Sequence, residues 1–275
     1  MPDVDSIPFI IAQEKGYFKE EGIEVTISPF KSAVDRDSAL QSGNLDGTIS
    51  DMLAVAFAKS GGFDVTITSL TSGSYKLVVN QNETAPTIEE LKGKDVAISK
   101  NTIIEYVTDR IMIAGGLVPQ DINKIFIPQI PTRLEMLQNG KISAATLPEP
   151  MATIAVKNGG RILNSSDQLG ISPGVMIFTT KAVGEKEKEI RAMYRAYNKA
   201  IDYLAHEPME NYIDVLIEKG GFPSSVKGAL VLPKYQKAAA PKGKDVEECM
   251  KWLQDRQLIP KIYSFQEVVD DRFVR

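Results

Sequence analysis

The heptapeptide Leu40-Gln41-Ser42-Gly43-Asn44-Leu45-Asp46 recurs later in the chain as Leu137-Gln138-Asn139-Gly140-Lys141-Ile142-Ser143. Each copy combines a helix end, a glycine stop and the start of a short apolar strand. A polar turn with a carboxylate follows each strand: Ser50-Asp51 in the first copy and Pro148-Glu149-Pro150 in the second. Because open α/β sheets bind ligands beyond the carboxyl ends of their strands, the repeat predicts two similar units that face one crevice. A common helix ending, Leu-Gln-x-Gly, explains the match equally well.

Short β-type runs alternate with helical patterns on both sides of this repeat, which predicts an α/β architecture of the parallel type. Thr132 and Glu135 are spaced as a helix capping box, and Gly140 is expected to end that helix. Apolar residues at three- and four-residue spacing in 185–205 predict a helical C-terminal third. The predicted strands are 23–28, 47–50, 65–70, 76–80, 95–99, 124–127, 144–147 and 175–180.

The composition excludes several classes of protein. A chain of 275 residues with 43% hydrophobic and 25% charged residues is long enough for one large domain or two smaller ones. The net charge of -4 argues against a nucleic-acid partner, and no apolar run approaches the roughly 20 residues that span a bilayer. With Cys249 and His206 as the single residues of their types, neither a disulfide within the chain nor a Cys/His zinc site is expected. No nucleotide-binding glycine motif occurs, and no cofactor is predicted.

The run from Ile7 to Val25, IPFIIAQEKGYFKEEGIEV, resembles the signature of one group of ABC-transporter substrate-binding proteins. That group is the nitrate/sulfonate/taurine and thiamin-precursor (NMT1/THI5-like) family. Further matches follow in order: the run LKGKDVA at 91–97, the Glu149-Pro150 turn and the closing Tyr263-Ser264-Phe265. The resemblance therefore covers essentially the whole chain.

The resemblance implies a two-lobed type II periplasmic-binding-protein fold that closes by a hinge around a small organic solute. Carried onto this chain, lobe one comprises 1–80 plus 181–275 and lobe two comprises 81–180. The two crossing segments are expected near 76–80 and 175–180. Family members usually have a β-strand just before the loop that corresponds to Met1-Pro2-Asp3, and without such a strand the neighbouring strand edges are expected to be unpaired.

The implied function is that of an extracytoplasmic solute-binding protein of an ABC importer, without catalysis. The expected solute is a sulfonate, a nitrate-like anion or a pyrimidine-type compound, and the expected partners are the permease subunits in the membrane. The protein is expected to be a monomer, either periplasmic or lipid-anchored at the cell surface. No signal segment or lipid-attachment motif precedes Met1, which also suits a cytoplasmic protein.

Polar residues in loops after strands are the candidate ligand-binding residues. Caps and turns are the competing explanation for most of them, because Asp and Ser favour both. Ser99, Asn101 and Thr102 end a strand and begin a helix, where exposed amides could hold a sulfonate or carboxylate. Glu149 instead suits an amine or another N–H donor, and so do the lobe-one carboxylates Asp5 and Asp51. The lobe-one candidates are Asp5, Ser6, Ser50, Asp51, Ser72 and Ser74.

Enzymatic alternatives are less well supported by the residues. The sequence at 170–174 matches the Gly-x-Ser-x-Gly elbow of hydrolases, but Pro173 lacks the N–H that the oxyanion hole requires. A pyrimidine synthase of thiamin biosynthesis has a similar fold but uses a cysteine-rich segment and a reactive histidine. Enzymes of menaquinone or thiamin-precursor biosynthesis remain the alternative function.

Overall fold

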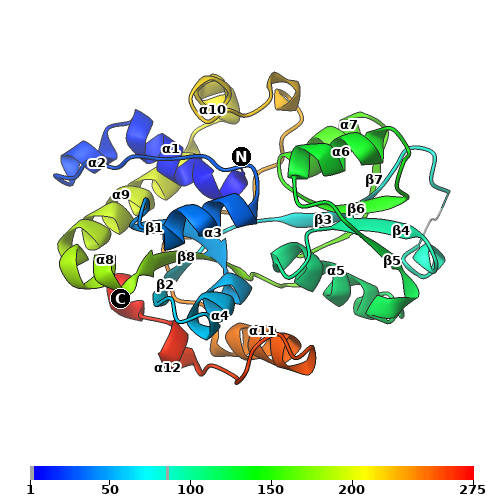
Figure 1. Ribbon diagram of the computed structural model, residues 1–275. Helices are drawn as coiled ribbons and strands as arrows, with labels where there is room; N and C mark the ends of the chain where they lie inside the picture. The colour runs from blue at the N-terminus through cyan, green and yellow to red at the C-terminus, as the bar shows by residue number, and fades with distance from the viewer. Residues whose placement is uncertain (1–2, 85–86) are drawn as a thin grey trace.

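The computed structural model describes residues 3–84 and 87–275, which form two β-sheets with helices packed around them (Figure 1). One sheet has three strands in the order β1-β8-β2, and the other has five in the order β5-β4-β6-β3-β7. The strands are β1 Gly47–Asp51, β2 Val65–Leu70, β3 Tyr75–Val79, β4 Asp95–Ile98, β5 Asn123–Phe126, β6 Ala144–Pro148, β7 Arg161–Ser165 and β8 Gly174–Thr179.

The helices divide between the two sheets. Figure 1 shows α5, α6 and α7 beside the five-stranded sheet and most of the others around the three-stranded sheet. The helices are α1 Ile7–Glu14, α2 Tyr17–Glu20, α3 Ala33–Gln41, α4 Met52–Ser60, α5 Ile103–Ala114, α6 Ile130–Gln138, α7 Met151–Lys157, α8 Thr180–Glu185, α9 Glu187–His206, α10 Ile213–Glu218, α11 Gly243–Asp255 and α12 Phe265–Val268.

The five-stranded sheet is mixed and the described strands of the three-stranded sheet are all antiparallel, so the expectation of a parallel-type architecture is only partly correct. The strand β4 is parallel to β5 and β6, whereas β3 is antiparallel to β6 and β7. In the other sheet β8 is antiparallel to both β1 and β2. The chain therefore leaves the three-stranded sheet after β2 and returns to its centre with β8.

The predicted crossing segments coincide with strands of different sheets. Residues 76–80 overlap β3 of the five-stranded sheet, and 175–180 overlap β8 of the three-stranded sheet. The connections between the sheets run from β2 to β3 and from β7 to β8. The lobe boundaries at residues 80 and 180 stay a prediction, and Met1, Pro2 and residues 85–86 lie outside the described part of the chain.

The strand predicted at 23–28 is wrong. Ile23, Val25 and Ile27 are half-buried and alternate with exposed residues, as in a strand that covers a core. The described chain nevertheless provides no neighbouring strand for this segment. An alternating pattern specifies which side chains face the core, whereas a strand also requires a hydrogen-bonded partner.

Two further local predictions need correction. The helix α6 begins at Ile130 with Gln129 as its N-cap, so Thr132 and Glu135 do not form a capping box. Pro131 explains the earlier start, because proline suits the first turn of a helix. The strand β7 was not predicted from the sequence.

The long helix α9 holds α1 in place. It buries apolar side chains at three- and four-residue spacing, including Ile190, Tyr194 and Tyr197. The ring of Phe9 in α1 lies 5.0 Å from that of Tyr197, measured between centroids. This packing fixes the N-terminal end of α1, where Ser6 is the N-cap.

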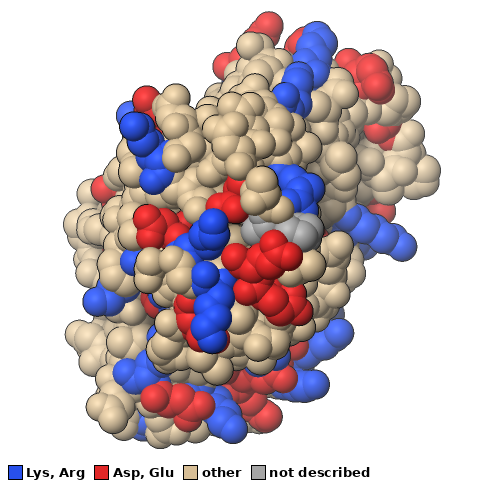
Figure 2. Space-filling model, turned by 90° about the vertical axis from the view of Figure 1, so that its right-hand side faces the viewer, with Lys and Arg blue, Asp and Glu red and all other residues tan. Residues whose placement is uncertain are grey.

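The surface carries charges of both signs. On the face shown in Figure 2, Lys and Arg side chains lie among Asp and Glu side chains. Such a mixed surface does not generate the single-sign field that attracts polyanions. Within residues 3–84 and 87–275, no helix is both long and apolar enough to cross a membrane.

Candidate functional site

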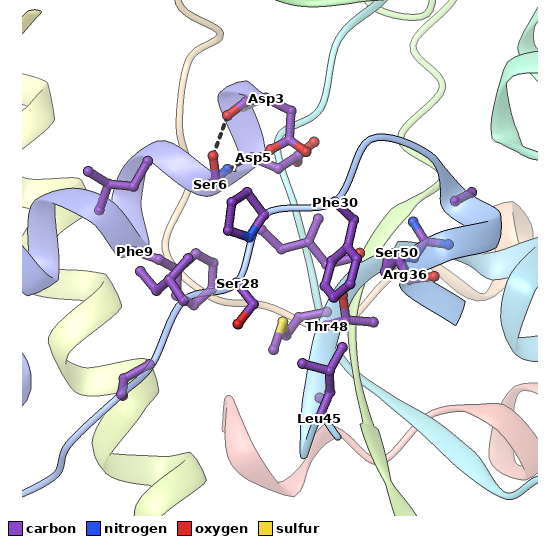
Figure 3. Close-up of a pocket in the computed structure, with 18 of the residues that line it drawn as sticks. Asp3, Asp5, Ser6, Phe9, Ser28, Phe30, Arg36, Leu45, Thr48 and Ser50 are labelled. Atoms are coloured by element: carbon purple, nitrogen blue, oxygen red, sulfur yellow. Dashed lines mark hydrogen bonds between the residues drawn. The ribbon is translucent and has the colours of Figure 1, made fainter. Parts of the chain in front are cut away.

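A cavity of about 1030 Å³ lies where strands of both sheets end and where neighbouring helices begin (Figure 3). Two of the predicted residues fall elsewhere: Ser72 is not among the lining residues, and Asn101 lines a neighbouring cavity of about 110 Å³. The structure thus brings most of the candidates together, and their role in ligand binding stays a prediction. The predicted residues that line the large cavity are Asp5, Ser6, Ser50, Asp51, Ser74, Ser99, Thr102 and Glu149.

Asp5 is a buried carboxyl group that caps no helix. The cap of the turn Val4–Ser6 is Asp3, whose Oδ1 accepts a hydrogen bond of 2.9 Å from the Ser6 amide. Asp5 is 5% exposed, and its Oδ1 has no hydrogen-bond partner among the described residues. Burial, with the Asp3 carboxylate as a second cause, raises the pKa of Asp5 to about 7. Near neutral pH this carboxyl group can therefore either donate or accept a hydrogen bond.

Ser50 and Asp51 end β1 and have different partners. Asp51 caps α4 by accepting a 2.9 Å hydrogen bond from the Ala54 amide, which confirms the capping interpretation for this residue. Burial raises the pKa of Asp51, and the charge of the nearby Arg36 opposes this shift. The buried Oγ of Ser50 has no partner in the described chain. Ser50 is thus a buried residue of the cavity wall whose hydroxyl group has unused hydrogen-bonding capacity.

The N-terminus of α5 forms part of the opposite wall. Thr102 caps it, with its Oγ1 accepting a 3.2 Å hydrogen bond from the Ile104 amide. Asn101 has a positive φ of 56°, and its amide donates to Oε2 of Glu105 over 2.8 Å. The positive end of the helix dipole and the Thr102 side chain therefore lie at the cavity.

A fully buried guanidinium group lies behind Ser99. Arg133 of α6 donates to the Ile127 and Thr146 carbonyls and to Oγ of Ser99. Within the described residues no carboxylate forms an ion pair with it, and burial lowers its pKa to about 9. At neutral pH the side chain is thus a buried cation without a counter-charge. The sequence analysis missed Arg133, although it occupies an inward position of α6 beside Leu134 and Leu137.

Glu149 and Ser74 already have partners within the protein. Glu149 pairs with Lys76, and its Oε2 accepts a 3.0 Å hydrogen bond from the Thr153 amide. Ser74 donates from Oγ to Asp167. The donor of Ser74 is thus occupied, whereas the remaining lone pairs of Ser74 and Glu149 can still accept a hydrogen bond.

Comparison with known proteins adds relatives of two kinds. The family model described as NMT1/THI5 like matches residues 3–211. The putative aliphatic sulfonates-binding protein of Bacillus subtilis (strain 168) is 27% identical over 203 residues, which is 70% of this chain and 61% of that protein. This chain therefore spans less than two thirds of that relative. A 4-amino-5-hydroxymethyl-2-methylpyrimidine phosphate synthase of Saccharomyces cerevisiae, THI13, is 25% identical over 255 residues, covering 85% of this chain and 72% of the synthase.

Solved structures of similar fold include solute-binding proteins and also the desulfurization enzyme DSZB, which has a TM-score of 0.70 at 12% identity and covers 99% of this chain and 94% of DSZB. The periplasmic aliphatic sulphonate binding protein SsuA from Escherichia coli has a TM-score of 0.82 at 19% identity, covering 97% of this chain and 94% of SsuA. The alkanesulfonate-binding protein SsuA from Xanthomonas axonopodis pv. citri, bound to MOPS, has a TM-score of 0.80 at 17% identity, with coverages of 98% and 96%. These similarities confirm the predicted type II periplasmic-binding-protein fold.

Proposed function

The chain belongs to the NMT1/THI5-like family, and we propose from this membership that it is the solute-binding protein of an ABC importer. It acts outside the cytoplasmic membrane and is a monomer. The lobes close on one small organic solute, and the closed form presents the surface that the permease subunits recognise. No bond of the solute is made or broken.

The uncompensated Arg133 behind Ser99 is the observation that carries the assignment of the solute. Because Ser99 accepts a hydrogen bond from Arg133, its own hydroxyl hydrogen is free to point into the cavity. The capped N-terminus of α5 adds a partial positive charge beside it. The anionic head of the solute binds here, as an organic sulfonate would, and the names of the sulfonate-binding relatives support this class.

The wall on the lobe-one side suits the other end of the solute. Asp5 and Ser50 each have a buried oxygen without a partner in the described chain. A donor on the solute that reaches either oxygen would remove the free-energy cost of leaving that oxygen unpaired. A small molecule with a sulfonate at one end and an N–H or O–H donor at the other matches the two walls.

A pyrimidine phosphate synthase is the alternative, because several relatives carry that name. The residues give it less support. Cys249 is buried in the core, where desolvation raises the pKa of its thiol, and His206 ends α9, with Nδ1 2.8 Å from the Asp202 carbonyl oxygen. Neither lines the large cavity.

Calorimetric titration with a panel of solutes tests both functions. The panel holds taurine, ethanesulfonate, nitrate, ethanolamine and an aminopyrimidine. We expect taurine to bind most tightly, and Ser99→Ala to weaken its affinity about tenfold, the effect of one charge-assisted hydrogen bond. The matched control is Ser28→Ala, since Ser28 lines the same cavity away from α5.

Mass spectrometry of the recovered solute separates binding from catalysis. Intact taurine after prolonged incubation supports the binding function. A changed product that accumulates over repeated turnovers supports the synthase instead. Tight binding of the aminopyrimidine with no binding of either sulfonate contradicts the proposed solute but not the proposed binding function.

A further inference from the structure

Glu105 of α5 is a buried carboxylate that belongs to the wall of neither cavity. It is 5% exposed, and it is not among the described residues that line the large cavity or its smaller neighbour. Its Oε2 accepts a 2.8 Å hydrogen bond from the Asn101 amide, and its Oε1 accepts one of 2.8 Å from Nζ of Lys124 in β5. The carboxylate therefore joins the turn before α5 to a neighbouring strand.

The turn 99–102 contains a residue in an unfavourable backbone conformation. Asn101 has a φ of 56°, in the left-handed region that disfavours residues with a side chain. Ser99 and Thr102, on either side of it, both line the large cavity. Oγ1 of Thr102 donates a 3.0 Å hydrogen bond to the Ser99 carbonyl oxygen, which links the two ends of the turn. The hydrogen bond from Asn101 to Glu105 holds the turn in this conformation.

The contact differs from an ordinary capping box. In that motif the glutamate at the third helical position accepts a hydrogen bond from the amide of the N-cap residue. Thr102 is the N-cap of α5 and Glu105 is the third helical residue, yet Glu105 accepts from Asn101, one residue earlier. Among residues 3–84 and 87–275, the Thr102 amide has no hydrogen-bond acceptor. Glu105 thus stabilises the turn and leaves this amide available beside the cavity.

Neighbouring charges compensate Glu105. Lys124 also lies 2.7 Å from Oδ1 of Asp109. Arg256 of α11 pairs with Asp109, and its Nη1 lies 3.7 Å from Oε1 of Glu105. The cluster therefore holds two carboxylates and two cations, and its formal charges cancel. Because such a neutral cluster does not repel an anion at the nearby wall, a carboxylate can support an anion site here.

We propose that Glu105 is a positioning residue of the solute site. Its carboxylate holds the turn 99–102 in the conformation that presents the Ser99 hydroxyl group and the Thr102 amide to the anionic head of the solute. It touches no atom of the solute itself. A wall that already has its binding conformation binds more tightly, because less conformational entropy is lost on binding. The inference rests on the proposed function, since it requires an anion at this wall.

Calorimetric titration with ethanesulfonate compares three variants with the natural protein. Glu105→Ala removes the acceptor of the Asn101 amide, and we expect its affinity to fall about tenfold. Glu105→Gln keeps a side-chain oxygen for that amide and should retain the natural affinity. Asp109→Ala is the matched control, because it removes the other carboxylate of the cluster, whose partners lie in β5 and α11 rather than in the turn. Its affinity should not fall.

The sign of the change separates positioning from electrostatics. Each of the three variants removes one negative charge from the same cluster, which by itself would favour the binding of an anion. A loss of affinity in Glu105→Ala therefore reports the lost hydrogen bond to the turn and not the lost charge.

Fluorescence of Trp252, the single tryptophan of the chain, checks the folding of Glu105→Ala. In this variant Lys124 keeps Asp109 as its partner, so the cluster retains one of its two carboxylates. Trp252 of α11 donates to the same Asp109 of α5. Unchanged emission of Trp252 shows that α11 still packs against α5, and the affinity of the variant then reports on the turn.

Amide hydrogen exchange without solute separates this inference from the proposed function. The Asn101 amide should exchange about tenfold faster in Glu105→Ala than in the natural protein or in Glu105→Gln, because its acceptor is lost. Faster exchange together with weaker binding in Glu105→Ala alone supports the proposal. Equal losses of affinity in Glu105→Ala and Asp109→Ala, or natural affinity in Glu105→Ala, would overturn it.

A natural protein that binds no ethanesulfonate would contradict the proposed solute. The exchange of the Asn101 amide then decides the role of Glu105 by itself. Faster exchange in Glu105→Ala supports its hold on the turn, and unchanged exchange would overturn it.

Discussion

Lys76 and Glu149 form an ion pair beside the antiparallel strands β3 and β6, at the wall of the large cavity. The Glu149 side chain is 1% exposed and that of Lys76 is 15% exposed. The Thr153 amide donates a further hydrogen bond to the same carboxylate. Glu149 is thus compensated within the protein, whereas Asp5 and Asp51 line the same cavity and have no lysine partner among the described residues.

Replacing Lys76 should destabilise the protein because it leaves a buried carboxylate unpaired. We expect Lys76→Met to lower the free energy of unfolding by about 3 kcal/mol. The double variant Lys76→Met/Glu149→Gln should recover a large part of that loss, since both charges are then absent. Urea denaturation of Lys76→Met, Glu149→Gln and the double variant measures the coupling free energy between the two side chains. Equal stability of the Lys76→Met and double variants would contradict the ion pair.

Asp5 should make stability depend on pH in an unusual direction. In the folded protein its pKa is raised to about 7 by burial and by Asp3, from an ordinary value of 3.8. The folded state therefore holds a proton that the unfolded chain releases between these values. The contribution of Asp5 to stability is complete below pH 3.8 and is lost as the pH rises through about 7.

The variant Asp5→Asn should lack this pH dependence. Between the two pKa values, we expect the unfolding free energy of the natural protein, relative to that of Asp5→Asn, to fall by at most about 1.4 kcal/mol per pH unit. Urea denaturation at several pH values measures it. The control is Asp64→Asn, because the Asp64 side chain is 74% exposed. Parallel pH profiles of the natural protein and Asp5→Asn would show that Asp5 is not the responsible group.

Arg133 should affect both stability and the binding of anions. We expect Arg133→Met to lower the free energy of unfolding by about 2 kcal/mol, because the Ile127 and Thr146 carbonyls lose their donors. Its affinity for ethanesulfonate should fall more than its affinity for ethanolamine, since the buried cation is removed. Arg133→Lys keeps a charge and should bind ethanesulfonate better than Arg133→Met does. Titration calorimetry with both solutes separates the effect on the anion from a general loss of structure.

Asp109 connects α5, which lies beside the five-stranded sheet, with α11. Its Oδ2 accepts a 3.1 Å hydrogen bond from Nε1 of Trp252 and pairs with Arg256, while Lys124 lies 2.7 Å from its Oδ1. Trp252→Phe should cost about 1 kcal/mol of stability, because a hydrogen bond is lost while an aromatic ring remains against Tyr106. Asp109→Ala should cost about 2 kcal/mol, because Lys124 and Arg256 each lose one carboxylate partner and keep only Glu105. Urea denaturation that ranks the variants in the opposite order would contradict this role.

The local elements were predictable because their signals lie within a few residues of one another. The repeated Leu-Gln-x-Gly ends α3 and α6, and Gly43 and Gly140 both have the positive φ that glycine accommodates. Asp51 at the start of α4 was an equally local prediction, and its capping hydrogen bond is present. The β-type run 65–70 coincides with β2.

The amino-acid sequence alone was sufficient for the fold class, most strands and several residues of the cavity wall, whereas the segments 22–33 and 44–49 were not predicted to line the cavity. Tertiary structure decided which backbones pair and which charges are compensated. The segment 23–28 alternates as a strand yet has no strand partner among residues 3–84 and 87–275. Lys76 neutralises Glu149, and Arg133 reaches Ser99 from another element. Helix ends and alternating burial depend on near neighbours in the chain, whereas strand pairing and buried charge depend on residues that only folding brings together.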